Sequence, residues 1–233
     1  NRQSLRIVTL LEQHCTQYRG LDVNREVLEG LQKHRTPYDR ASEDPGVPQR
    51  WPSIEAAIVN LADEIAYTAH DCDDGLRAGL FPFADLHAVT IVREAAERAR
   101  PRGTELRGTL IHLLLADLYE ASQKRLQDER IQSLEDVYQC SRPLVAFSGT
   151  TRDAIEELHR FLWERLYLHP GILSANTEGK KTVQTLCQKL LTDPSDKVKE
   201  MHRNFDGALA EAVKDYVAGM TDWFASEQVR RAD

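Results

Sequence analysis

The chain has 233 residues, of which 41% are hydrophobic and 29% are charged, and its formal net charge at pH 7 is −7. This length suffices for one large domain or two small ones. The acidic balance argues against a surface built mainly to hold duplex nucleic acid. No apolar run approaches the roughly 18 residues of a membrane span, so we expect no membrane contact. The four cysteines form no CxxC pair, which favours free thiols and a cytoplasmic location over disulfides.

Helical periodicity dominates the sequence, because apolar residues recur at spacings of three and four and alternation by two is scarce. The opening NRQSLRIVTLLEQ predicts a first helix, and the absence of an initiator Met suggests that the true beginning of the chain is missing. A second helix is expected within residues 22–34, with Asp22 or Asn24 as its cap. Residues 36–52 contain four prolines and predict a loop.

A long helix is predicted to begin after Ser53 and to run to about Leu80, and another follows and ends near Arg100. The remaining helices are expected at about 104–127, 133–140, 151–170, 181–194 and 206–230. No repeat, convincing strand or domain boundary is visible. The sequence therefore predicts an all-α protein with a single helical domain over residues 1–233.

The long helix that follows Ser53 carries an unusual polar stripe. Asp63, Tyr67 and Asp71 are four residues apart, so they lie one above the other on a helix. Spacing alone favours an ordinary solvated face with a tyrosine packed along it. Chemistry favours a site, because a carboxylate can bind a metal ion and a tyrosine with an aspartate one turn further on can hold a sugar.

Several long segments resemble one protein family. The stretches GLDVNREVLEGLQKHRTPYD, ADEIAYTAHDCDDGLRAGL and KDYVAGMTDWFA resemble the bacterial deoxyguanosinetriphosphate triphosphohydrolase-like proteins, in the HD-domain superfamily. NRQSLRIVTLLE and FLWERLYLHP look like the same family, and the resemblance covers nearly the whole chain in order. It implies a multi-helix HD-domain-type phosphohydrolase bundle. It also implies hydrolysis of a deoxynucleoside triphosphate to the deoxynucleoside and triphosphate, with a divalent metal ion, Mg²⁺ or Mn²⁺.

The resemblance also assigns roles to the stripe. The motif ADEIAY places one metal ligand at Asp63, sets Tyr67 against the deoxyribose, and gives Asp71 the 3′-hydroxyl. A tyrosine beneath the sugar leaves little room for a 2′-hydroxyl. His70 and Asp71 spell HD but do not match the family's metal pair, since adjacent helical side chains point about 100° apart. The other metal ligands and the catalytic residues of the family precede the segment that resembles NRQSLRIVTLLE, so we expect them upstream of this chain.

The negative triphosphate calls for basic side chains. Lys33, Arg160 and Arg165 are candidates, although Arg165 is equally well interpreted as a member of a surface ion pair. In the segment DYVAGMTDWFA, Tyr216, Met220 and Phe224 predict an apolar seam that belongs to the core or to a subunit contact.

Partners follow from the resemblance. It implies a deoxynucleoside triphosphate substrate, a homo-oligomer and room for a nucleotide effector, and it leaves single-stranded nucleic acid binding open. Two alternative functions are also considered. One is hydrolysis of another nucleotide or phosphoester by a related HD phosphohydrolase. The other is non-enzymatic nucleotide sensing by a scaffold that lost its metal. Because only one metal ligand of four is present, we expect this polypeptide alone to leave dNTPs intact.

Overall fold

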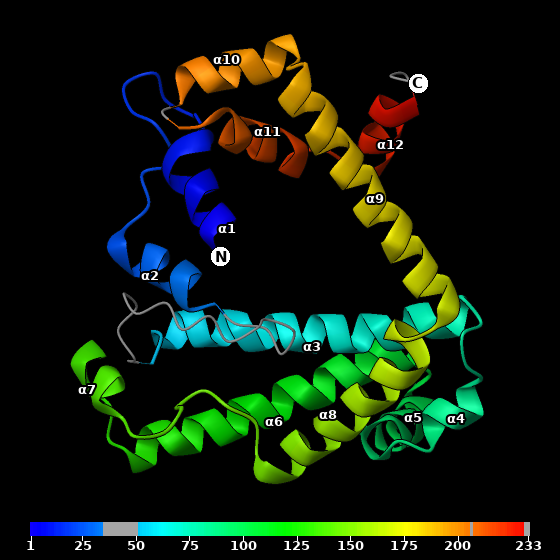
Figure 1. Ribbon diagram of the computed structural model, residues 1–233. Coiled ribbons are helices and arrows are strands. Elements are labelled where there is room, and N and C mark those ends of the chain that lie inside the picture. The colour runs from blue at the N-terminus through cyan, green and yellow to red at the C-terminus, as the bar shows by residue number, and fades with distance from the viewer. Residues whose placement is uncertain (35–50, 206, 231–233) are drawn as a thin grey trace. The chain divides into compact units, whose positions relative to one another are not determined.

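The structure, a computed structural model, describes residues 1–34, 51–205 and 207–230 (Figure 1). Within these ranges it is helical, and its extended pairing is confined to one isolated bridge between Gln13 and Gly20. The all-α prediction is therefore confirmed. The contacts divide the chain into two compact units, Asn1–Leu166 and Tyr167–Asp233, where the sequence predicted one domain. Among the described helices, none combines the length and apolar character needed to cross a bilayer.

The first unit contains most of the helices. They are α1 (Arg2–Arg6), a short π-helical turn η1 (Ile7–Leu11), α2 (Arg25–Lys33), α3 (Ile54–Arg77), α4 (Phe83–His87), α5 (Thr90–Arg102), α6 (Leu106–Asp128), α7 (Leu134–Gln139) and α8 (Gly149–Leu162). A second π-helical turn, η2 (Trp163–Tyr167), continues α8. These positions follow the predicted helices closely, apart from the short α4, which was not predicted.

Side-chain caps fix where the early helices begin. The Asn24 side chain accepts a hydrogen bond from the Val27 N–H at 2.9 Å, which settles the choice between the two predicted caps. The Ser53 hydroxyl accepts from the Ala56 N–H at 3.2 Å, and so α3 begins at the predicted place. The loop predicted at 36–52 lies outside the described residues except for its last two.

The core of the first unit forms where α3, α5, α6 and α8 pack on one another. Each helix buries one apolar face, and the burial of these faces drives the packing. The buried side chains include Ile65, Ala69 and Cys72 on α3, Val92 and Ala95 on α5, Leu110 and Leu114 on α6, and Ile155, Leu158 and Leu162 on α8. Because the apolar face of α3 is buried in this core, the position of the polar stripe relative to α5, α6 and α8 is fixed.

The C-terminal end of α3 contains a glycine with no room for a side chain. A Cβ atom at Gly75 would overlap the ring of Phe81, which is 3% exposed and packs edge-on against Phe161 at 5.0 Å. In an open helix, Gly→Ala stabilises by about 1 kcal/mol. Here overpacking outweighs that gain, and we expect Gly75→Ala to lower the free energy of unfolding by about 1–2 kcal/mol.

Urea denaturation would measure this effect. Gly108→Ala is the matched control, because Gly108 is also helical and a Cβ there would meet nothing within 4 Å. It should leave stability unchanged or slightly raised. A Gly75→Ala variant as stable as the control would contradict the proposed clash with Phe81.

The second unit differs more from the prediction. It contains α9 (Pro170–Thr192), α10 (Asp196–Asn204), α11 (Leu209–Ala218) and α12 (Asp222–Arg230), with a core at Val198, Ala212 and Val213. The helix predicted at 181–194 begins instead at Pro170, because proline fits the first turn of a helix, where its missing N–H costs nothing. The helix predicted at 151–170 ends where α9 begins, and α10 was not predicted.

The helix predicted at 206–230 is two helices. α11 ends at Ala218 with Gly219 as its cap, and the Thr221 hydroxyl accepts from the Phe224 N–H at 3.2 Å to begin α12. The predicted continuous seam of Tyr216, Met220 and Phe224 is therefore wrong, since it crosses the break between the two helices.

Candidate functional site

The polar stripe lies on regular α-helix, so its predicted alignment holds. Asp63 is exposed, whereas Tyr67 and Asp71 are half-buried, and the hydroxyl oxygen of Tyr67 is buried. The three side chains share one side of α3, away from the face that packs on α6. The stripe thus passes from solvent at Asp63 towards the protein interior at Tyr67 and Asp71.

α8 borders the buried end of the stripe. The ring of His159 stacks on the ring of Tyr67, with centroids 5.8 Å apart and planes 24° apart. The same imidazole is joined through Nε2 to the Thr68 hydroxyl at 2.9 Å. Since Thr68 is buried, these contacts hold His159 against α3 and fix one face of the Tyr67 ring.

One turn of α3 from Thr68, a buried ion pair joins the same two helices. The two terminal nitrogens of the Arg152 guanidinium, Nη1 and Nη2, donate to the Glu64 carboxylate at 2.6 and 3.2 Å. The Glu64 side chain is 8% exposed and that of Arg152 35%. The guanidinium also lies over the Phe147 ring, 4.9 Å from its centroid. Such bidentate pairing fixes the orientation of the two side chains as well as balancing their charges. It therefore holds α3 and α8 in a defined relative position beside the stripe.

Burial lowers the pKa of His159, and the nearby Arg152 lowers it further, although the carboxylates of Glu64, Glu156 and Asp71 oppose this shift. The imidazole beside Tyr67 is therefore neutral at physiological pH. By contrast, the Cys72 thiol faces the core, where burial raises its pKa to about 12, so it is no candidate nucleophile at neutral pH.

The lowered pKa of His159 predicts a pH dependence of stability. An unfolded histidine binds a proton near pH 6.5, whereas folded His159 does so only at lower pH. Folding stability should therefore be full above pH 6.5 and fall as the pH drops below it. We expect the stability difference between wild type and His159→Gln to shrink between pH 7.5 and 5.5, measured by urea denaturation. A difference that stays constant over this range would contradict the proposed burial of a neutral imidazole.

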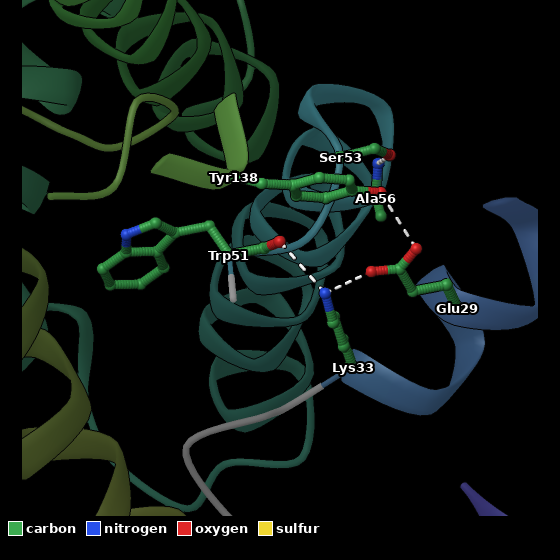
Figure 2. A network of polar contacts seen from close by, with 6 residues as sticks. All are labelled: Glu29, Lys33, Trp51, Ser53, Ala56 and Tyr138. Carbon is green, nitrogen blue, oxygen red and sulfur yellow. Dashed lines mark hydrogen bonds and ion pairs between the residues drawn. The ribbon is translucent and has the colours of Figure 1, made fainter. Parts of the chain in front are cut away.

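Lys33, a predicted phosphate contact, lies in a separate network (Figure 2). Its amine is bonded to the Glu29 carboxylate, donates to the Trp51 carbonyl oxygen at 3.1 Å, and lies 5.2 Å from the centroid of the Tyr138 ring. The Tyr138 hydroxyl donates to the other Glu29 oxygen at 2.9 Å. The hydrogen bond from Lys33 lowers the pKa of Glu29. A phosphate would have to draw Lys33 out of this buried network.

The other predicted basic residues lie at the surface. Arg165 forms an exposed ion pair with Asp85 at 3.5 Å, and Arg160 is exposed. His70 is also exposed. Among the described residues, no three His, Cys, Asp or Glu side chains converge in a way that could hold a metal ion. Within these residues Asp63 is therefore not part of a complete metal site.

The C-terminal part of the chain matches a known domain family. Residues 145–231 match the model of the phosphohydrolase-associated domain. This match begins before α8 and includes Arg152 and His159, which both bond to side chains of α3.

Named relatives extend this similarity to the rest of the chain. Over 99% of its length it is 38% identical to the deoxyguanosinetriphosphate triphosphohydrolase-like protein of Brucella suis. It is 36% and 37% identical to the proteins of that name from Geobacter sulfurreducens and Geobacter metallireducens. The chain is thus related to a phosphohydrolase family, and the resemblance noted in the sequence is confirmed. It spans 65% of the Brucella protein and 63% of each Geobacter protein.

Proposed function

We propose that the whole protein is a metal-dependent hydrolase that converts deoxynucleoside triphosphates to deoxynucleosides and triphosphate, and that α3 carries its metal ligand and sugar site. The observation that carries this proposal is the arrangement around Tyr67. Its ring is supported on one face by His159, with Asp63 exposed one turn before it and Asp71 half-buried one turn after it. The relatives' name, which refers to dGTP triphosphohydrolysis, supports the same activity.

The supported tyrosine gives a physical basis for sugar selection. The stacked His159 ring prevents the Tyr67 ring from moving away from a bound sugar, because Thr68 and the packing of α8 hold the imidazole in place. A deoxyribose resting on it would fit, and a 2′-hydroxyl in the same place would lose its hydration without gaining a partner. Asp71 would accept a hydrogen bond from the 3′-hydroxyl.

The metal ion requires residues beyond those described. Asp63 offers an exposed carboxylate of the kind that Mg²⁺ and Mn²⁺ prefer, but the described residues bring no second and third ligand to it. When bound in the whole protein, the ion would polarise the α-phosphate and lower the pKa of the attacking water. Phosphate charge would be met by basic groups, of which Arg165 is the easier to recruit because exposed pairs such as its bond to Asp85 are weak.

The proposal is tested by the products. The full-length protein is incubated with dGTP and with the other dNTPs, with Mg²⁺ or Mn²⁺, and the products are separated by ion chromatography. Intact triphosphate and deoxynucleoside are expected. Stepwise release of single phosphates would indicate another HD phosphohydrolase, and no turnover by a protein that binds dNTP would indicate a sensing module. The 233-residue chain, assayed in parallel, should leave every dNTP unchanged.

A further inference from the structure

A second charged feature lies in the first unit, between the end of α6, the start of α8 and the segment that joins α7 to α8. It is a cavity of about 300 Å³ whose lining includes three arginines. The lining residues are Arg125, Arg142, Pro143, Ala146, Phe147, Gly149 and Arg152. None of them is acidic, although the chain as a whole has a net charge of −7. Every charged side chain that lines the cavity is therefore basic.

The three guanidinium groups differ in how their charge is balanced. Arg152 is paired with the buried Glu64, and Arg142 forms an exposed pair with Glu129 at 2.8 Å. The hydrogen bonds of Arg125 go to neutral groups, namely the carbonyl oxygens of Phe147 at 2.9 Å and Pro143 at 3.5 Å. The positive charge of Arg125 is therefore not cancelled by these partners, and that of Arg142 is balanced only by a pair that is weak in water.

The start of α8 contributes little to this charge. Asp117 accepts hydrogen bonds from the Ser148 N–H at 2.9 Å and the Ser148 hydroxyl at 2.6 Å, so a carboxylate already occupies the beginning of the helix. Any attraction for an anion must come from the arginines. The hydrogen bonds from Arg125 to backbone carbonyl oxygens hold the 143–147 segment against α6. They therefore fix the shape of the cavity.

We propose that this cavity binds the phosphate groups of a small polyanion, either a nucleotide polyphosphate or inorganic polyphosphate. Guanidinium groups bind phosphate oxygens through paired hydrogen bonds, and a chain of phosphates offers enough oxygens to meet more than one arginine at once. A volume of about 300 Å³ suits a small ligand. Its lining includes no residue of α3, and binding there needs neither the metal ion nor catalytic turnover.

Titration calorimetry on the 233-residue chain, without divalent metal, tests the proposal with tripolyphosphate as the probe. Binding is expected to weaken as salt rises. Arg142→Gln should weaken it about tenfold, the loss of one charged hydrogen bond. Glu129→Gln should tighten it about two- to threefold, because it frees Arg142. This opposite change cannot arise from unfolding.

Arg98→Gln is the matched control, since Arg98 forms a similar exposed pair with Glu94 at 2.6 Å outside the cavity. It should bind tripolyphosphate as wild type does. Repeating the titration with dGTP identifies the source of the phosphates: tighter binding that still depends on Arg142 assigns the site to a nucleotide, and equal binding assigns it to inorganic polyphosphate. Absence of millimolar binding, or equal affinities in Arg142→Gln and Arg98→Gln, would overturn the proposal.

Discussion

Asp63→Ala in the full-length protein is expected to reduce dNTP hydrolysis by roughly 10³-fold or more, because the metal that activates water would lose a ligand. Metal content per protomer, measured on the dialysed protein, should fall with activity. Folding should be almost unaffected, within about 0.5 kcal/mol, since the Asp63 side chain is exposed on the surface of α3. Loss of function without loss of stability distinguishes a ligand from a structural residue.

Asp74→Ala provides the matched control. It removes the same charge from an exposed position on the same helix, near the same side of α3. Its activity and metal content should equal those of the wild type. If Asp63→Ala retained wild-type activity, Asp63 could not be a ligand of the catalytic metal. If both variants lost activity equally, the effect would be one of general charge and not of ligation.

Arg152→Gln is expected to cost about 3 kcal/mol of folding stability, whereas Glu64→Gln should cost only about 1 kcal/mol. The two residues form one ion pair, but their surroundings differ. Removing Arg152 leaves the Glu64 carboxylate charged and buried at 8% exposure. Removing the charge of Glu64 leaves a guanidinium that is 35% exposed and can turn to water. The asymmetry follows from burial and not from the strength of the bond.

Chemical denaturation of the two variants and of Arg98→Gln would measure these costs. Arg98 lies in an exposed pair on α5, so its loss should change stability by no more than about 0.5 kcal/mol. Equal costs for Arg152→Gln and Glu64→Gln would show that Glu64 is better solvated than its burial in this fold indicates.

The sequence was sufficient for most of the helices because their signals are local. The caps at Asn24 and Ser53 and the apolar spacing of α3 and α8 act within a few residues. The errors arose where one residue type has more than one structural use. Pro170 begins α9, although proline also stops helices, and Gly219 ends α11, although glycine also permits close packing.

The candidate site was predictable only in part, for a similar reason. The alignment of Asp63, Tyr67 and Asp71 needs only the helical period. Their support needs contacts between distant residues: Arg152 is 88 residues from Glu64, and His159 is 91 residues from Thr68. Neither α3 nor α8 contains a local sequence signal that predicts these contacts between the two helices. The one local signal is that Arg152 and His159, two turns apart, border the apolar face of α8 and so must meet whatever covers that face.

The most direct test of the proposed sugar site compares dGTP with 2′,3′-dideoxy-GTP, which lacks the 3′-hydroxyl assigned to Asp71. For the wild-type full-length protein, kcat/KM should favour dGTP by about 10–100-fold, the contribution of a hydrogen bond to a charged group. In Asp71→Ala, the two substrates should differ by no more than about twofold, because the acceptor that distinguishes them is gone. An Asp71→Ala variant that keeps the wild-type preference would show that the 3′-hydroxyl is bound elsewhere and that α3 does not hold the sugar.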